Sequence, residues 1–492
     1  MPAVSEINWP VLWFVVIYLA FIIAVAIYAG RVQKGMKDFF AGGMDIPWWV
    51  VGFSVTAATM SGWGFVGMPG MVYQTGWAYG AVIGVGASTG LVMSFYLLAK
   101  PMRKCAEKLG SITIPDVMEM RYNSRNLRLI TAIGILLGTI GYNAAQYKAF
   151  ANMLQAIFPV SYIPALFIGV AILTAYTIVG GMKSVAWADF FETLVMLGAA
   201  GFAFFYGMYL CGGLTTANAA LASKNPDWIN LIHTQGGPMT LMAFFSVALV
   251  LGVGYLGQPH VMTKFYQIDK KIGLKWACIF ATVSFLIVIL AYYTGIWQRV
   301  LEIQGKTPVI PHADLAAPMF VAQQLPPLMA GLTFAGVIAA IMSTSGAFIL
   351  VASSAIVRDI IQVYILKGRQ IDGPTQMKWS RIATAGVIII TTLISIKPIT
   401  LVGWLGLASW GIYAATLTTP LVLGFWWKRA TKAAAISSSL VGLIGGIGLF
   451  TLKQLKIYTS KMDPMGVAFM AAIVVFIVVT YMTKEESNAY WE

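Results

Sequence analysis

The chain has 492 residues, of which 59% are hydrophobic and only 10% are charged. Soluble domains carry about a quarter charged residues, so this composition excludes an ordinary soluble protein. The net charge of +14 could by itself indicate nucleic-acid binding, but its basic residues lie mainly in short segments between long apolar runs.

About thirteen apolar runs follow one another, each long enough to cross roughly 30 Å of hydrocarbon as a helix. Because the runs are continuous rather than alternating, a transmembrane barrel is excluded. We therefore predict an all-α polytopic membrane protein. In chain order the expected spans lie near 9–30, 48–74, 77–100, 127–158, 161–182, 188–212, 238–262, 272–298, 326–357, 379–396, 400–424, 432–451 and 463–483.

Basic residues are distributed unevenly between the connecting segments. If the loop after the first span is cytoplasmic, about three quarters of the 32 Lys and Arg residues fall on the cytoplasmic side. This bias predicts an amino terminus outside and a carboxyl terminus in the cytoplasm, in a plasma membrane (the inner membrane of a bacterium). The lipid bilayer is an expected partner and nucleic acid is not. We take the monomer as the functional unit.

Two spans are interrupted by helix-breaking residues. The second span contains AATMSGWGFVGMPG (Ala57 to Gly70), with a break around Met60–Gly62, and the seventh contains LGVGYLGQPH (Leu251 to His260). Counting from each interrupted span gives units of five helices. Because five is an odd number, the second unit lies inverted in the membrane relative to the first. Paired interruptions predict a transporter with a five-plus-five inverted-repeat core. We divide the chain into an extra amino-terminal helix with a cytoplasmic loop (1–47), a first repeat (48–212), a second repeat (238–424), and two additional helices with a short tail (425–492).

The breaks predict a binding site. An unwound helix leaves backbone groups without partners, which costs several kcal/mol per group in a membrane. Free carbonyls suit a hard cation, and the amino terminus of the second half-helix suits a carboxylate. The ninth span adds AAIMSTSG (Ala339 to Gly346), where Ser343 and Thr344 supply hydroxyls. The alternative is a kink tolerated by packing, with hydroxyls bonded to their own helix.

The motifs resemble those of the sodium–solute symporter family, whose bacterial members carry proline or pantothenate and whose animal members carry sugars, iodide and vitamins. The resemblance covers nearly the whole chain and is closest to the bacterial sodium/proline and sodium/pantothenate symporters. It is carried by SGWGFVGMPG (Ser61–Gly70), VGGMKSVAWAD (Val179–Asp189), GYLGQPH (Gly254–His260), IMST (Ile341–Thr344) and SSAIVRD (Ser353–Asp359), and, for the pantothenate branch, by PLVLGFWWKRATKAAA (Pro420–Ala435) and the segment Leu325–Thr344.

The resemblance implies that sodium is the co-transported ion, with one ion per cycle. Its ligands would be the backbone carbonyls of Ala57, Met60 and Ala340 and the hydroxyls of Ser343 and Thr344. Together these five oxygens would replace much of the water shell of the ion.

A second sodium site looks incomplete. Some relatives hold another sodium with hydroxyls one turn beyond the first pair, where this chain has Gly346 and Ala347, and with an acidic residue on the sixth span. That acidic position is Asp189, with Glu192 one turn later. A carboxylate at a membrane helix end is costly unless it is used. We expect Asp189 to act as a gate or on the sodium exit path, or else to form a cytoplasmic structural pair.

Seven residues are expected to contact the solute, six from the resemblance and Gln146 because it shares a helix face with Tyr142. Two departures from the proline symporter, Thr59 in place of an aspartate and Leu251 in place of a tryptophan, weaken a strict proline assignment. The seven are Ser61, Gly62, Trp63, Tyr142, Gln146, Tyr255 and Pro259.

We therefore expect a sodium-coupled symporter that imports a small carboxylate-bearing solute by alternating access: a proline-like amino acid, a monocarboxylate or a pantothenate-like acid. A proton-coupled carrier of the same fold and a transporter-like solute sensor remain as alternatives. No enzyme is expected, because no nucleophile–base or paired-carboxylate arrangement is recognisable. The three Cys and three His residues are too dispersed for a transition-metal site, so sodium is the one metal ion expected.

Overall fold

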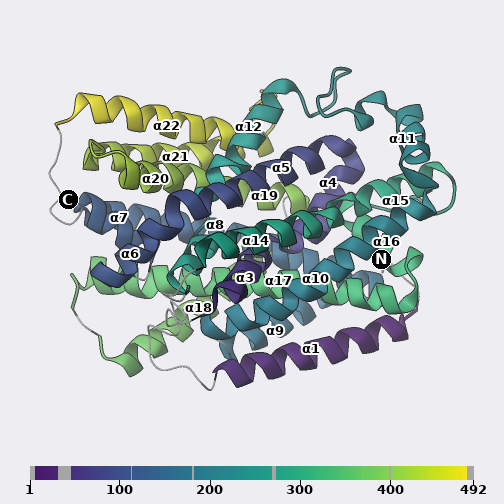
Figure 1. Cartoon of the computed structure of the whole chain (residues 1–492), viewed down its shortest axis with the longest axis horizontal. Helices are drawn as coiled ribbons and strands as arrows, with labels where there is room; N and C mark the ends of the chain where they lie inside the picture. Colours follow the sequence, from purple (N-terminus) through teal and green to yellow (C-terminus); the bar gives the residue numbers. More distant parts are fainter. Residues whose placement is uncertain are drawn as a thin grey trace.

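The computed structural model describes residues 6–30, 46–111, 113–179, 182–268, 273–369, 371–397 and 400–484. Regular structure in these ranges is helical, apart from one isolated bridge between Ile46 and Ile268. Figure 1 shows the long helices running side by side along the long axis of one bundle.

The helices are named α, and short 3-10 or π segments are named η. The first part of the chain forms α1 (Trp9–Gly30), α3 (Trp48–Thr59), η2 (Trp63–Gly67), α4 (Met68–Thr75), α5 (Trp77–Ser94), η3 (Phe95–Ala99), α6 (Lys100–Leu109), α7 (Ile114–Tyr122), α8 (Arg125–Ile157), α9 (Tyr162–Val179), α10 (Met182–Leu210), α11 (Gly213–Lys224) and η4 (Pro226–Ile229). The second part forms α12 (Leu241–Leu251), η5 (Val253–Gly257), α13 (Pro259–Met262), η6 (Thr263–Tyr266), α14 (Leu274–Val288), η7 (Ile289–Tyr293), α15 (Thr294–Ile303), η8 (Ala313–Leu315), α16 (Ala316–Gln324), α17 (Pro327–Ser354), η9 (Ala355–Ile365), α18 (Gly373–Ile396), α19 (Val402–Tyr413), η10 (Ala414–Thr418), α20 (Thr419–Trp426), α21 (Lys432–Gln454) and α22 (Pro464–Met482).

The number of membrane spans agrees with the sequence. Within the described ranges, ten helices are long and apolar enough to cross a membrane, and the bent pair Trp48–Thr59 and Trp63–Thr75 makes an eleventh. Two shorter apolar helices, Trp9–Val25 and Tyr162–Ala175, coincide with the two remaining expected spans. The all-α polytopic architecture is therefore confirmed.

Polar side chains determine where several spans begin. The first amides of a helix lack intrahelical acceptors, and a Ser, Thr or Asp side chain just before the helix can accept from them. Ser124, Thr240, Thr431 and Asp463 do so for α8, α12, α21 and α22. Each cap lies where an apolar run meets a polar connection.

Both predicted discontinuities are present. α3 ends at Thr59, Met60 has extended backbone (φ −91°, ψ 126°), and the chain continues into η2 and α4 after a bend of 49°. α12 ends at Leu251 and continues as the 3-10 segment η5, and the extended backbone of Gln258 precedes α13. The second and seventh spans are therefore broken, as the glycine and proline pattern predicted.

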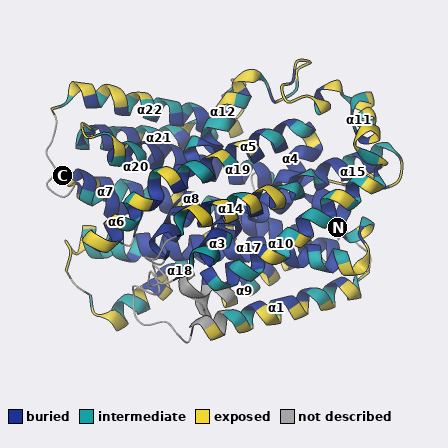
Figure 2. Ribbon diagram, viewed as in Figure 1, coloured by how far each residue is buried: buried dark blue, intermediate teal, exposed yellow. Residues whose placement is uncertain are grey.

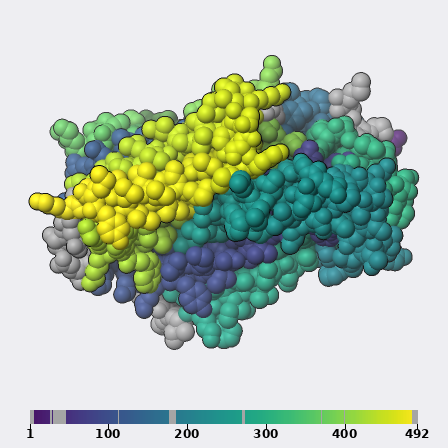
Figure 3. Space-filling model, turned by 90° about the horizontal axis from the view of Figure 1, so that it is seen from above, coloured from purple at the N-terminus to yellow at the C-terminus, as the bar shows by residue number. Residues whose placement is uncertain are grey.

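The centre of the bundle is α17, whose apolar stretch is entirely buried. It contacts α1, α3, α8, α9 and α10. Figure 2 shows buried residues filling the middle of the bundle, whereas exposed residues line the outer faces of helices such as α1 and α22. In Figure 3 the carboxyl-terminal helices cover one side of the bundle, where α22 contacts α12. The hydroxyl pair of α17 thus lies in the most enclosed part of the molecule.

Candidate functional site

Five oxygen atoms from α3 and α17 face one another at the first break. Ser343 Oγ lies 3.2 Å from the carbonyl oxygen of Ala57 and 3.1 Å from that of Ala340. Thr344 Oγ1 lies 3.4 Å from the carbonyl oxygen of Ala57 and 3.2 Å from that of Met60. All five residues are completely buried. The structure brings together every residue that the sequence assigned to the sodium site.

The geometry of these oxygens fits a cation. Each hydroxyl has one proton but faces two carbonyl oxygens, so it can donate to only one of them at a time. The separations of 3.1 to 3.4 Å also exceed the roughly 2.5–3.0 Å of ordinary O–H···O bonds. Because α3 ends at Thr59, the carbonyls of its last turn lack the donors of a continuous helix. A hard cation coordinated by all five oxygens would satisfy them.

Side chains of α8 hold the start of η2. The amide of Gly62 donates to Gln146 Oε1 at 2.8 Å, and Ser61 Oγ lies 3.0 Å from the hydroxyl of Tyr142. Ser61 Oγ also accepts from the amide of Trp63 at 3.1 Å. Five of the seven expected solute-contacting residues therefore take part in two adjoining sets of hydrogen bonds. The sequence predicted that the amides at the start of the second half-helix would bind a carboxylate. In the structure the amides of Gly62 and Trp63 donate to Gln146 and Ser61.

Gly62 is needed for the close approach of three helices. A Cβ atom at this position would lie 2.6 Å from Ile341 Cγ1 on α17 and 2.8 Å from Gln146 Oε1 on α8. Real Cβ contacts are not this short, so a larger residue would force these helices apart.

Tyr255 joins the two breaks directly. Its hydroxyl lies 2.6 Å from Thr59 Oγ1, so the position that departs from the proline symporter still bonds the broken seventh span. Pro259 lies elsewhere: it begins α13 and lines a small separate cavity of about 20 Å³ with Ile135, Thr263 and other residues. Six of the seven expected residues thus lie around the first break, and Pro259 lines a different space.

Three buried aromatic residues that the sequence reasoning did not assign pack around this region. The ring of Trp410 stacks on that of Trp63 with 6.0 Å between centroids and lies 5.7 Å from that of Tyr255. The rings of His260 and Phe348 lie 4.0 Å apart, and His260 lies 6.0 Å from Trp410. An indole in the middle of an apolar span needs an acceptor for its N–H, and this was the available signal for Trp410.

Several buried hydrogen-bonding groups in this region lack a partner among the described residues, including both ring nitrogens of His260. Trp410 Nε1 and Gln146 Nε2 are buried and have no acceptor in the described part of the chain. Burying such groups without a partner is unfavourable. A solute with acceptor oxygens would satisfy them.

Asp189 on α10 forms a buried ion pair. Its Oδ2 accepts from Ser54 Oγ at 2.5 Å and from Lys264 Nζ at 2.7 Å, and all three residues are fully buried. Ser54 lies three residues before Ala57 on α3, so the pair is one helical turn from the cation site. Asp189 is therefore paired with a lysine that the sequence reasoning missed, and the cytoplasmic position expected for such a pair stays a prediction. The gate or exit role stays a prediction.

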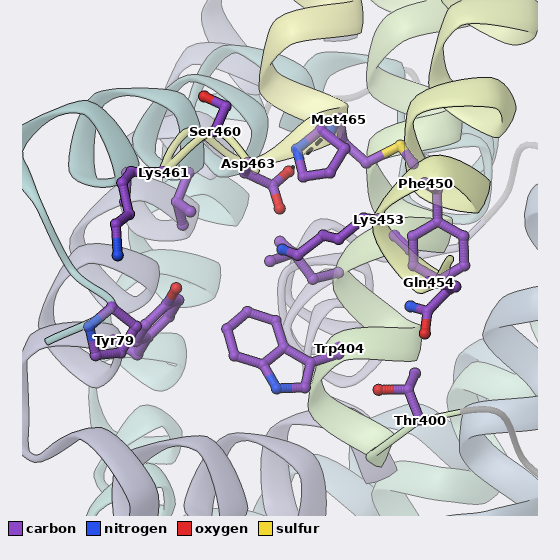
Figure 4. Close-up of a pocket in the computed structure, with 16 residues that line it drawn as sticks. Tyr79, Thr400, Trp404, Phe450, Lys453, Gln454, Ser460, Lys461, Asp463 and Met465 are labelled. Carbon is purple, nitrogen blue, oxygen red and sulfur yellow. Dashed lines mark hydrogen bonds between the residues drawn. The ribbon is translucent and has the colours of Figure 1, made fainter. Parts of the chain in front are cut away.

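A larger cavity of about 410 Å³ lies apart from these residues, lined from α5, α12, α19, α21 and α22. Figure 4 shows Trp404, Lys453 and Asp463 around it, and Lys453 Nζ lies 5.3 Å from the centre of the Trp404 ring. The indole N–H of Trp63 donates to the carbonyl of Gly403 at 2.8 Å, from the other side of α19. This helix therefore separates the cavity from the group at the first break.

Curated relatives match over most of their length. The chain is 28% identical over 481 residues to the high-affinity proline transporter PutP of Bacillus subtilis, covering 94% of this chain and 96% of the relative. It is 26% identical over 454 residues to the sodium/proline symporter of Salmonella typhimurium, covering 89% and 87%, and 25% identical over 502 residues to that of Staphylococcus aureus, covering 98% and 94%.

Two solved structures share the fold. A sodium-coupled sialic acid symporter, in a substrate-bound outward-open state, superposes with a TM-score of 0.77 at 20% identity, over 98% of this chain and 99% of that one. Mhp1, a nucleobase-cation-symport-1 family transporter in a closed conformation, gives a TM-score of 0.53 at 14% identity, over 92% and 96%. The sequence profile of the sodium:solute symporter family matches residues 39–442, and this chain belongs to that family.

Proposed function

We propose that this protein is a symporter that uses one sodium ion per cycle to import a small solute bearing a carboxylate. The observation that carries the proposal is the convergence of five buried oxygens at the first helix break, from Ala57, Met60, Ala340, Ser343 and Thr344. Sodium entering from outside replaces its water shell with these oxygens and fixes the unwound backbone beside the solute site. The coupling is reciprocal, so sodium and solute raise each other's affinity by the same factor.

The solute site is proposed to lie between the two breaks, against Trp63, Tyr142, Tyr255 and Trp410. The free donors Trp410 Nε1 and Gln146 Nε2 suit the oxygens of a carboxylate, and the rings supply apolar walls. Monocarboxylates, pantothenate-like acids and proline-like amino acids all carry this group, and the curated relatives named above are proline transporters. Thr59, at the position of an acid in the proline symporter, leaves an ammonium group without that partner.

The ion gradient supplies the work. One sodium ion moving inward contributes about 2.3 kcal/mol per 100 mV of membrane potential, in addition to its concentration gradient. This supports accumulation of a neutral or singly anionic solute. After inward opening, sodium leaves first, past Asp189, whose Oδ1 receives no hydrogen bond from a hydroxyl, amide or ammonium group in the described part of the chain.

Uptake into proteoliposomes tests this function. Purified protein is reconstituted, and radiolabelled proline, acetate, pyruvate, lactate, pantothenate and glucose are each offered with an inward sodium gradient or with choline in its place. We expect sodium-dependent accumulation of at least one of the carboxylates and none of glucose. Uptake that follows a proton gradient without sodium would replace the proposal by proton coupling, and sodium-driven uptake of glucose alone would overturn the solute class.

A further inference from the structure

A buried cluster of polar groups lies one helical turn from the proposed sodium site. Asp189 Oδ2 accepts from Ser54 and pairs with Lys264. The other Asp189 oxygen and both oxygens of Glu192 receive no hydrogen bond from any hydroxyl, amide or ammonium group of the described chain. The hydroxyl of Tyr18, buried and also without a partner, interacts electrostatically with both carboxyl groups. We call these five residues the Asp189 cluster.

The Asp189 cluster has the composition of a cation site. It gathers four carboxyl oxygens and two hydroxyl oxygens, which are the ligands that hard cations prefer. Asp189 and Glu192 lie one turn apart on α10, and their carboxyl groups share a hydrogen bond, which requires a proton on one of them, and both interact with Lys264. Buried carboxylates in a membrane protein require a compensating positive charge. Here that charge is the ammonium of Lys264, completely buried and 2.7 Å from Asp189.

We propose that Lys264 is a tethered cation that takes the place of a second sodium ion at the Asp189 cluster. The inference rests on the proposed function and deepens it, because it explains why only one sodium ion is transported in each cycle. The ammonium group is covalently attached to η6, so it neutralises Asp189 without an ion taken from the medium.

The same arrangement affects how sodium leaves. A sodium ion that leaves Ala57 and Thr344 reaches the carboxyl oxygens of the Asp189 cluster, one turn away along α3. The ammonium of Lys264 is already bound there. Repulsion between the ion and the Lys264 ammonium keeps its affinity there low, so the ion passes and is not retained. Without the ammonium, the same oxygens would hold a second sodium ion.

Counting bound sodium tests the inference. The purified full-length protein in lipid nanodiscs is titrated with radioactive sodium at neutral pH without solute, and saturable sites per protein are measured. We expect one site in the unaltered protein and two, a twofold rise, in Lys264→Gln and Lys264→Ala. Lys264→Arg, which keeps the charge, should bind one. Lys275→Ala, which removes an exposed lysine of α14, is the matched control and should also bind one.

The outcomes separate the two proposals. One site in Lys264→Gln and Lys264→Ala overturns the tethered-cation inference and leaves the proposed function intact, whereas no saturable site in the unaltered protein overturns the proposed function. Breaking a buried pair can unfold a protein, but removing both partners is better tolerated. The double variant Asp189→Asn/Lys264→Met is therefore an independent check: it should bind one sodium ion, and complete loss of binding would locate the ion at Asp189 and overturn the inference.

Discussion

The hydroxyl residues of α17 differ in what they face. Thr333 donates to the carbonyl of Met329, four residues earlier on the same helix, at 2.8 Å, which is the ordinary behaviour of a helical threonine. Thr344 faces the carbonyl of Ala57 in α3 and that of Met60 at the break, and Ser343 faces one carbonyl of α3 and one of α17. Position relative to the break in α3, and not residue type, distinguishes a candidate ligand from a self-bonded hydroxyl.

Removing either hydroxyl should weaken sodium binding. In Ser343→Ala and Thr344→Ala, one of five oxygen ligands is lost, and we expect the sodium concentration for half-maximal uptake to rise about tenfold or more, equivalent to about 1.4 kcal/mol or more. Uptake into proteoliposomes over a range of sodium concentrations measures this. Thr333→Ala, which loses only a bond within α17, should leave the value unchanged. Equal sodium dependence in all three variants would show that these hydroxyls do not bind the ion.

The indole N–H of Trp410 offers a test of the solute site. Trp410→Phe keeps an aromatic ring but removes the free donor, so we expect the KM for the solute to rise several-fold, while sodium binding without solute stays within twofold. Trp426→Phe is the control, because the Trp426 indole is exposed and donates to the carbonyl of Leu97. A KM that changes equally in both variants would show that Trp410 has no specific role with the solute.

The residues of the candidate site were predictable to different degrees. Ser343 and Thr344 were found because adjacent hydroxyls in an apolar span are conspicuous and because the motif around them resembles a known family. Lys264 and Trp410 were missed because their significance depends on partners far away in the sequence: Asp189 precedes Lys264 by 75 residues. Local patterns carry no information on such pairings.

At the scale of the helices, the motif SSAIVRD has a structural role. Asp359 in SSAIVRD accepts from the guanidinium of Arg128 at 2.5 and 2.8 Å. Arg128 also pairs with Asp116 and Glu119. This network joins α7, α8 and η9. Motif resemblance therefore includes residues that hold helices together as well as residues near the break.

The break in the second span should not tolerate a larger residue. Gly62→Ala places a methyl group within 2.6 Å of Ile341, and overpacking of this kind costs about 1–3 kcal/mol. We expect a lower midpoint of thermal unfolding in detergent and at least tenfold slower uptake by the protein that remains folded. Gly201→Ala on α10 is the matched control, because a Cβ there meets no atom within 4 Å. Unaltered stability and uptake in Gly62→Ala would show that the helices can separate at no cost.

At the scale of the whole molecule, apolar runs of span length predicted the helix bundle. The discontinuities followed from glycine and proline within two of these runs. Neither pattern predicted how the spans pack: α17 lies at the centre and contacts helices from both halves of the chain, which no local pattern specifies. The boundaries of the two repeats, 48–212 and 238–424, stay a prediction. Short helices outside the spans, such as α11 and α16, were also absent from the sequence-based description, because helices of this length have weak periodic signals.

The orientation of the bundle yields a prediction that depends on all spans together. The first helix begins at one end of the bundle and the last helix ends at the other (Figure 1), as an odd number of crossings requires. The excess of basic residues predicts which end is cytoplasmic. Ser460, between α21 and α22, should lie outside, and Arg369, between η9 and α18, should lie in the cytoplasm. Both are exposed in the structure.

A membrane-impermeant maleimide applied to intact cells distinguishes the two sides. Ser460→Cys should be labelled directly, and Arg369→Cys only after the membrane is permeabilised. The native Cys105, Cys211 and Cys278 are buried, so the unaltered protein should remain unlabelled and serves as the control. The reverse pattern would invert the topology and place the Asp189 cluster on the sodium entry side. Labelling of both variants in intact cells would mean that the two loops lie on the same side. This would contradict the predicted topology, because the spans 379–396, 400–424 and 432–451 separate them.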